Sequence, residues 1–372
     1  MKKIVSLIVS LVILGGIITP VNGQTDALLK AQNYWLNNKE LNSLDAVLTV
    51  EALGLDVEDN KNGFVVNYDF AAPVNSYGEM VKYEDMDCGY LSKNIMALVS
   101  MKIDPSKLML ADGSIKNLIE ILKSKIDDEG NVFYGNGNLE SSIIYTMYAL
   151  SIVEPNYNLS KLGAKLADLQ LDDGCWGYNG AWGGPDVTGW AIGALALCGD
   201  TYQSSIDKAL TYFVSIQQDD GAFVPNDGWS VANSNTQGCV VWGLLEYDVN
   251  SVKAGVLKKS YESLMTFLLE DGSFAYKADQ DYGDNYATIQ AGLALGVYEN
   301  GSLFSNLRSQ YKEMLNPQPN IPENTPTPEE NKTIPTDKTV AAVKTGDDAL
   351  ILTGMFMFIV SGGIFLSVKK VF

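Results

Sequence analysis

One short phrase, in which an acidic turn is followed by glycine and soon by an aromatic residue, occurs three times in this chain. It reads LADLQLDDGCWGY, VSIQQDDGAFVP and MTFLLEDGSFAY at residues 166–178, 214–225 and 265–276. The turn glycines Gly174, Gly221 and Gly272 are spaced by about 50 residues, a period typical of repeat proteins whose units pack on their neighbours. The period therefore constrains the fold before any single motif does.

Each phrase is followed by an apolar stretch with helical spacing, at residues 187–197, 237–247 and 286–297. We interpret one unit as an outer helix, an acidic glycine turn, a loop and an inner helix. An outer helix is predicted over residues 159–171, and Gly174 is expected to take a positive φ where that helix ends. The inner stretches are apolar nearly all round and rich in small residues, which is typical of helices buried on most sides.

Three polar residues take equivalent positions ahead of these inner helices, namely Asp186, Asn235 and Asp284. Asp and Asn are good N-cap residues, because the side-chain oxygen accepts a hydrogen bond from a free backbone N–H group. We therefore expect all three to be N-caps.

Weaker copies extend the repeat towards the N-terminus. Residues 126–153 form a further unit, and residues 86–101 and 43–55 have the pattern of two more inner helices. Six such units predict an all-α fold, an α/α toroid of about six helical hairpins over residues 24–315. Closure into a ring removes the exposed ends that an open solenoid must cap.

The two ends of the chain predict export and anchoring. Residues 1–23 have a basic start, an apolar run and small residues before Gln24, as in a secretory signal peptide. Residues 316–344 contain six of the 12 prolines and predict an extended stalk. Residues 349–368 are long and apolar enough to span a bilayer, and two lysines follow. We expect a single-pass protein with its toroid outside the cell.

The segment AVKTGDD, at residues 342–348, resembles the sorting signal of Gram-positive surface proteins. The resemblance implies that a sortase is a partner, cleaving between Thr345 and Gly346 and joining Thr345 to the cell wall. Residues 345–372 would then be a sorting signal and transmembrane anchor. Val343 stands where the signal usually has proline, so simple membrane retention stays open as the alternative.

Composition excludes several kinds of function. A net charge of −19 argues against nucleic acid and anionic membrane surfaces as ligands. The absence of histidine removes the commonest general base and any zinc site that needs imidazole. We expect no resident cofactor or metal. In an exported chain disulfides are possible, and three pairings are open to Cys88, Cys175, Cys198 and Cys239.

The phrases QLDDGCW (170–176) and QDDGAF (218–223) resemble the QW-type repeat of the prenyltransferase and squalene-cyclase α/α toroids, the terpenoid cyclase-like superfamily. The resemblance covers nearly all of residues 24–315 and is strongest over 126–298. It implies the toroid fold but no single activity, because such toroids include terpenoid cyclases, protein prenyltransferases, complement-type thioester domains and cobalamin carriers.

Two of these activities do not fit the residues present. The prenyltransferases hold zinc with Asp, Cys and His, and this chain has no histidine. The thioester domains need a Gly-Cys-Gly-Glu-Gln step. Cys175 and Cys239 each follow a glycine, but neither is followed by the Glu-Gln that supplies the acyl partner.

The cyclase and carrier resemblances remain as alternatives. Cyclases protonate their substrate with an aspartic acid that heads an inner helix, and here the near match implies Asp87 as the acid, assisted by Asp85. Those enzymes work between two helical domains, whereas this chain has residues for one. A cobalamin carrier would lack the β domain that covers the corrin, because no strand-rich region follows Leu315.

Aromatic and polar residues of the later units make the candidate binding site. In a toroid the inner helices line a central funnel, and aromatic walls with a polar rim suit an apolar or planar ligand or a sugar ring. The alternative explanation for the aromatic residues is packing within the repeats. The acidic groups of the turns could bind calcium, and the alternative is that they are solvated. The candidate ligand-binding residues are Trp182, Asp186, Trp190, Trp229, Asn235, Tyr282, Asp284 and Tyr286.

The sequence thus predicts a surface-displayed toroid that binds a small apolar molecule, a glycan or a protein partner. The sequence contains no complete set of catalytic residues of these families, so we expect binding rather than catalysis. Three alternatives stay open: a cyclase-like enzyme, a cobalamin-carrier-like protein, and an adhesive or structural module whose funnel is filled by side chains.

Overall fold

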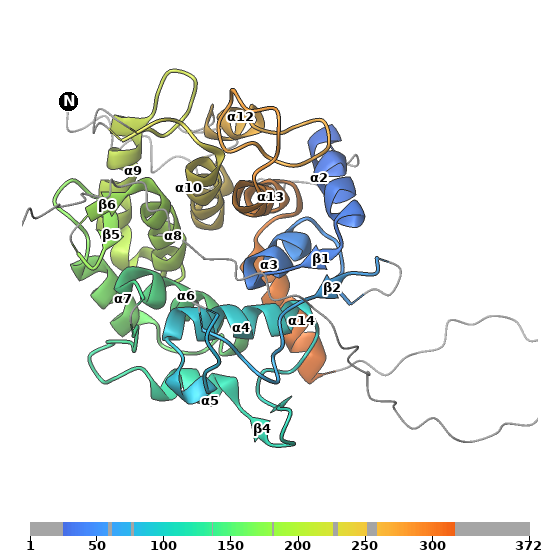
Figure 1. Cartoon of the computed structure of the whole chain (residues 1–372). Helices are drawn as coiled ribbons and strands as arrows, with labels where there is room; N and C mark the ends of the chain where they lie inside the picture. The colour runs from blue at the N-terminus through green and yellow to red at the C-terminus, as the bar shows by residue number, and fades with distance from the viewer. Residues whose placement is uncertain are drawn as a thin grey trace, which may run out of the picture.

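The computed structural model describes residues 25–58, 62–75, 78–135, 137–180, 182–225, 230–250 and 259–316. Within them, helices form a ring of two layers (Figure 1). The inner layer consists of α3 (Leu44–Ala52), α4 (Cys88–Ser100), α6 (Leu139–Val153), α8 (Pro185–Ala196), α10 (Ser234–Tyr247) and α13 (Asn285–Asn300). The outer layer consists of α2 (Asp26–Asn37), α5 (Leu118–Ser124), α7 (Ser160–Asp168), α9 (Gln203–Ile216) and α12 (Lys259–Met265).

The inner helices pack side by side in chain order, and α13 packs on α3 so that the ring closes (Figure 1). Their side chains are buried nearly all round, as the sequence predicts. The predicted all-α toroid is therefore confirmed for the described residues, and the predicted inner helices lie where the repeat placed them.

The second unit departs from the predicted hairpin. Between α3 and α4 the described residues contain no α-helix; they contain β2 (Val65–Val66), which pairs in parallel with β1 (Glu40–Leu41), and the 3₁₀ turn η1 (Tyr83–Asp85). This segment is rich in Asn, Asp and Gly and has no helical period of apolar residues, which explains why it crosses the outer layer as a loop.

Short hairpins and a second 3₁₀ turn complete the secondary structure. β3 (Leu108–Met109) pairs with β4 (Ile115–Lys116), and β5 (Trp176–Tyr178) pairs with β6 (Trp182–Gly184), both antiparallel. The turn η2 (Gly199–Tyr202) precedes α9. The glycine-rich loop before α8 is thus a hairpin, whose strands hold it against the inner layer.

The aromatic residue of the repeat phrase ties an outer helix to an inner one. Trp176 is fully buried, and its indole Nε1 donates to the Leu166 carbonyl in α7 at 2.7 Å. Its backbone N–H donates to the Thr188 hydroxyl in α8 at 2.9 Å. Phe274 makes the same backbone bond to Thr288 in α13, also at 2.9 Å. The phrase is therefore a structural strut, and its Trp176 and Phe274 are explained by packing.

The turn glycine of each phrase contacts the next outer helix. Gly174 has the expected positive φ, but α7 ends earlier, at Asp168, so Gly174 closes a tight turn and does not cap the helix. The same φ recurs at Gly130, Gly221 and Gly272. A Cβ at any of the four would overlap the backbone carbonyl of a lysine in the following outer helix, which is in turn Lys161, Lys208, Lys259 and Lys30. The last contact joins the final unit to the first.

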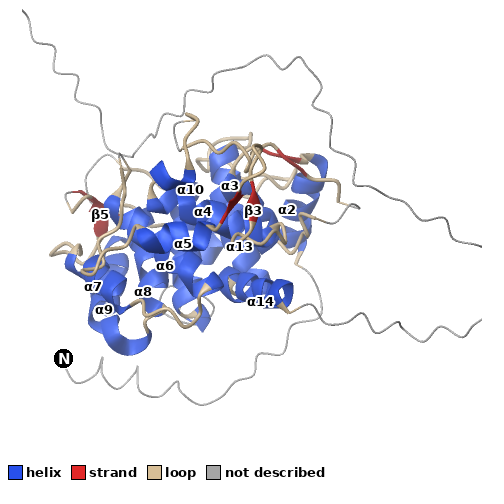
Figure 2. Ribbon diagram, turned by 90° about the horizontal axis from the view of Figure 1, so that it is seen from below, coloured by secondary structure: helices blue, strands red, loops and turns tan. Residues whose placement is uncertain are grey.

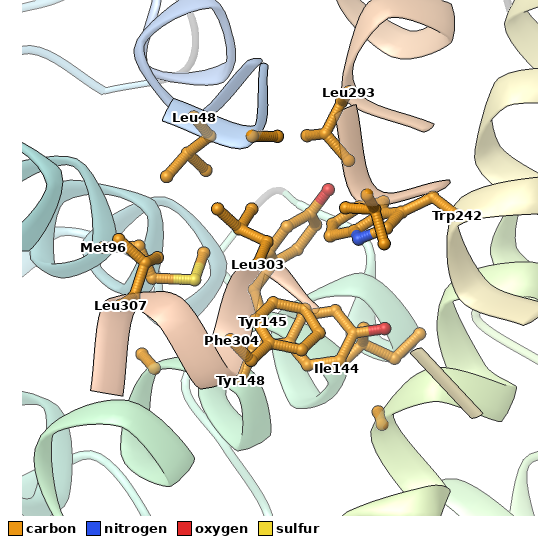
Figure 3. Close-up of a cluster of buried hydrophobic side chains, with 14 of the residues drawn as sticks. Leu48, Met96, Ile144, Tyr145, Tyr148, Trp242, Leu293, Leu303, Phe304 and Leu307 are labelled. Atoms are coloured by element: carbon orange, nitrogen blue, oxygen red, sulfur yellow. The ribbon is translucent and has the colours of Figure 1, made fainter. Parts of the chain in front are cut away.

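A further helix, α14 (Leu303–Leu315), lies across the end of the ring at which the inner helices have their C-termini (Figure 2). Its Phe304 points into the ring and stacks on Tyr148, with ring centroids 4.1 Å apart, and lies 5.7 Å from Trp242 (Figure 3). Leu303 and Leu307 are buried beside them. This half of the predicted funnel is therefore filled by side chains.

Two buried carboxylates hold α14 in place. Glu246 of α10 accepts hydrogen bonds from the Ser302 hydroxyl at 2.5 Å and the Leu303 N–H at 2.9 Å. Glu51 of α3 accepts a hydrogen bond from the Gln310 amide. α14 is thus fixed to two different inner helices.

All four cysteines are free thiols, so the structure contains none of the disulfide pairings that the sequence left open. Across the described part of the chain, no helix combines the length and hydropathy that a bilayer span requires. The predicted signal peptide, stalk beyond Asn316, sorting signal and membrane span lie outside the described residues.

Candidate functional site

The N-terminal ends of the inner helices converge at the end of the ring opposite α14. Asp284 is the N-cap of α13 as predicted, accepting from the Ala287 N–H at 2.8 Å. The prediction is wrong for the other two residues. The N-caps are Gly184 in α8 and Asn233 in α10, and Asp186 and Asn235 lie two residues inside their helices. The side chains of Asp186 and Asn235 therefore do not cap their helices.

The second helical position after the cap is polar in most of the inner helices. It holds Asp45, Glu140, Asp186, Asn235 and Tyr286 in α3, α6, α8, α10 and α13. Carboxylates in the first turn are stabilised by the helix dipole. Glu140 has a structural task, because it accepts hydrogen bonds from Asn179 and Gly180 at 2.8 and 2.6 Å and so fixes the turn between β5 and β6.

A partly buried ion pair lies at the centre of this end. The Lys93 ammonium of α4 is 2.9 Å from the Asp45 carboxylate and 4.5 Å from the centroid of the Tyr145 ring. Burial is the largest single effect on the pKa of Lys93 and lowers it, but the charge and hydrogen bond of Asp45 and the nearby Tyr286 and Tyr90 together hold that pKa above its ordinary value. Lys93 is therefore a fixed cation and not a neutral nucleophile.

A second polar pair stands beside an indole. The Asn235 amide Nδ2 donates to Asp186 at 3.3 Å, and Trp190 follows Asp186 by one helical turn. The Trp190 ring lies 5.8 Å from the Tyr145 ring. Two polar atoms here are buried and make no hydrogen bond of normal geometry, the donor Trp190 Nε1 and the acceptor Asn235 Oδ1, although the indole N–H interacts with the weakly accepting thiol of Cys239. Burial raises the pKa of Asp186. The hydrogen bonds that Asp186 accepts from Thr236 and Asn235 lower this pKa, but by less.

Tyr286 completes the site. Its side chain is 51 % exposed, yet burial of its hydroxyl raises its pKa, with smaller effects from the charges of Lys93 and Asp45. The tyrosine therefore lies between solvent and the ion pair. We use the term central cluster for Asp45, Lys93, Tyr145, Asp186, Trp190, Asn235 and Tyr286.

The remaining predicted binding residues are not members of the central cluster. Tyr282 is 61 % exposed, and its hydroxyl accepts from Gln280 at 3.0 Å. Trp182 lies in β6. Trp229 falls outside the described residues. Asp284 serves as the N-cap described above.

The two predicted cyclase acids do not form a pair. Asp87 is the N-cap of α4 and accepts from the Tyr90 N–H at 2.8 Å. Asp85 lies in η1 and is exposed. Burial raises the pKa of Asp87, opposite to the strengthening that a cyclase acid needs. Among the described residues, no cluster of three or more acidic or cysteine side chains has the geometry of a metal site.

Sequence reasoning missed Lys93 and Asp45, although a signal for Lys93 was present. It is the one cation within the inner helix predicted at residues 86–101, whose other charged residue, Asp87, stands at its start. A lysine inside a buried helix needs an anionic partner, and in a toroid that partner must come from a neighbouring inner helix.

Removing the Lys93 charge should destabilise the fold. We expect Lys93→Met to lower the free energy of unfolding by about 2 kcal/mol, because Asp45 is then left partly buried without its partner. The double variant Lys93→Met/Asp45→Asn should regain most of that loss. Urea unfolding of the three proteins measures both effects, and a double variant no more stable than the single one would show that the pair is not coupled.

Comparisons with known proteins support the fold. No family model and no curated protein matches the sequence. The structure is similar to Candida albicans protein geranylgeranyltransferase-I complexed with GGPP, with a TM-score of 0.50, 13% identity, and coverage of 79% of this chain and 100% of that chain.

Two further solved structures have TM-scores below that value. They are ent-copalyl diphosphate synthase from Streptomyces platensis (0.44; 14% identity; 74% of this chain and 51% of that chain) and a glycosyl hydrolase of family 88 from Bacteroides vulgatus (0.48; 12% identity; 76% and 97%). At this level of identity the similarity concerns the fold alone. The chain is therefore mostly helical and similar in fold to α/α toroid proteins.

Proposed function

We propose that this chain is a glycan-binding module displayed outside the cell, and that its ligand occupies the central cluster. Display rests on the signal peptide, stalk and anchor predicted from the sequence. The ligand class rests on the chemistry of the cluster.

The observation that carries the proposal is the pair of unsatisfied polar atoms. A buried donor and a buried acceptor without partners each cost free energy, about 1–3 kcal/mol. A hydroxyl group can accept from the Trp190 indole N–H, and a hydroxyl group can donate to the Asn235 Oδ1. Sugars supply hydroxyls at high density, whereas an isoprenoid chain supplies none.

The surrounding residues suit the same ligand. The exposed face of Tyr286 can cover the apolar C–H face of a sugar ring, and Asp186 and Lys93 offer charged partners to further hydroxyls. A long apolar ligand is a poorer fit, because Phe304, Tyr148 and Trp242 fill the axis towards α14 (Figure 3).

The test is binding of the full chain to a printed array of bacterial and animal oligosaccharides, followed by titration of the best oligosaccharide. We expect Tyr286→Ala to weaken that binding about tenfold while the melting temperature stays close to that of the wild type. The matched control is Val214→Ala on α9, which also removes an apolar side chain that is about half exposed, 52 % against 51 %.

The proposal fails if no oligosaccharide binds saturably, or if Tyr286→Ala binds as tightly as the Val214→Ala control. A protein that binds cells but no glycan would favour the adhesive alternative.

A further inference from the structure

A cavity of about 460 Å³ lies at the other end of the molecule from the central cluster. It is lined by the C-terminal ends of α6 and α8, the start of α7 and one residue of α14. Its volume falls within the range of small-molecule sites, about 300–1,000 Å³. Because it lies at the C-terminal ends of the inner helices, the cavity is separate from the proposed glycan site. An inference about it does not depend on that proposal.

Arg308 is the chain's single arginine, and it lines this cavity. Its Nε donates to the Ser151 carbonyl at 2.7 Å, which satisfies a free acceptor in the last turn of α6. Within the described part of the chain, the guanidinium makes no other hydrogen bond and no ion pair. One donor is enough for the capping role, so the terminal nitrogens, whose fork geometry matches a carboxylate, remain available.

The charge balance of the cavity favours a singly charged anion. Glu154 also lines the cavity, and its carboxylate lies 3.3 Å from the Lys123 ammonium, which Glu120 shares at 2.8 Å. Arg308 is the one cationic side chain of the lining, and it has no carboxylate partner among the described residues. A phosphate dianion would lie close to Glu154 with one uncompensated cation to hold it, whereas a carboxylate matches Arg308 in charge and shape.

The rest of the lining suits hydroxyl groups. The Tyr157 and Ser160 hydroxyls line the cavity and make no hydrogen bond with the described residues. The N-terminus of α7 adds a partial positive charge on the same side. We infer that this cavity binds a sugar acid, with its carboxylate on Arg308 and its hydroxyls on Tyr157 and Ser160.

The experiment titrates the full chain, purified in a mild detergent, with D-glucuronate, D-glucose and inorganic phosphate by isothermal calorimetry. We expect saturable binding of glucuronate and none of glucose, with phosphate much weaker than glucuronate. Arg308→Gln should weaken glucuronate binding at least about tenfold, because a glutamine can still donate to Ser151 but carries no charge.

A variant that binds more tightly complements Arg308→Gln, because misfolding can weaken binding but cannot strengthen it. Glu154→Gln removes the anion that lines the cavity, while Lys123 keeps its ion pair with Glu120, so the variant should bind glucuronate about threefold more tightly. Tyr286→Ala, at the central cluster, should bind glucuronate as the wild type does, which separates this site from the proposed glycan site.

Three results would overturn the inference. They are no saturable glucuronate binding at millimolar concentration, equal affinity of wild type and Arg308→Gln, or loss of glucuronate binding in Tyr286→Ala. Phosphate that binds as tightly as glucuronate would show a general anion site in place of a carboxylate site.

Discussion

Gly272→Ala should lower the free energy of unfolding by about 3–5 kcal/mol, because it damages the contact that closes the ring. Gly272 has a φ of +86°, where an L-residue is strained by about 1–2 kcal/mol. Its new Cβ would also overlap the Lys30 carbonyl of α2, so the last unit could no longer approach the first without a backbone shift. Urea unfolding gives the magnitude, and hydrogen exchange shows whether α2 opens first.

Gly301→Ala is the matched control for this prediction. Gly301 has a nearly identical φ of +90°, but a Cβ there would meet nothing within 4 Å. It should therefore cost the backbone strain alone, about 1–3 kcal/mol, because its ψ of −174° lies in a region that L-residues rarely adopt. If the two variants lose the same stability, the Gly272–Lys30 contact does not hold the ring closed.

The stability of the fold should fall as the pH rises from about 4.5 to above 7. Burial raises the pKa of Glu246 to about 7 and that of Glu51 to about 7, from 4.5. In both cases the folded state binds the proton more tightly than the unfolded state, so the stabilisation is complete at low pH and is lost as the pH passes through 7. Each carboxylate accounts for about 3 kcal/mol.

Glu246→Gln isolates one of these contributions. The amide can still accept from the Leu303 N–H but does not ionise. We expect the variant to match the wild type near pH 5 and to exceed it by about 3 kcal/mol at pH 8, in urea unfolding at the two pH values. Glu313→Gln, on the exposed face of α14, should leave the pH profile unchanged. A wild type as stable as Glu246→Gln at pH 8 would contradict the raised pKa.

The repeat could be predicted from sequence because each of its parts has a local cause. The turn glycine needs a positive φ, the aromatic residue needs a buried partner, and the inner helix needs apolar and small side chains on all sides. The hydrogen bond from Trp176 to Thr188 has its counterpart between Phe274 and Thr288, so the phrase recurs with the same contact. Six inner helices built in this way pack side by side, and the packing of α13 on α3 closes the ring.

The site could be predicted less well, because it depends on helix register and on contacts between units. The repeat alignment predicts Asp186 and Asn235 as N-caps, but the N-caps are Gly184 and Asn233, two residues earlier in each case. A shift of two residues converts a capping side chain into one that faces its neighbour. The Lys93–Asp45 pair joins residues far apart in sequence, which no local pattern reveals.

The role of α14 also escaped prediction. Its sequence has an ordinary amphipathic pattern, which is compatible with an outer helix as well as with a helix across the end of a ring. Its place follows from the partners of Glu246 and Glu51, two acids that inner helices would otherwise bury without compensation. That placement changes the functional argument, because it fills half of the axis.

The central claim is that the central cluster holds a sugar, and native mass spectrometry of the full chain, released gently from its host into detergent, tests it most directly. In an Arg308→Gln background, which disables the cavity at the other end, we expect a bound mass that is freed on denaturation and corresponds to a saccharide, and its loss when Asp186→Ala/Trp190→Ala is added. Release of an isoprenoid or a corrin, or the same saccharide retained by the double variant, would contradict the account.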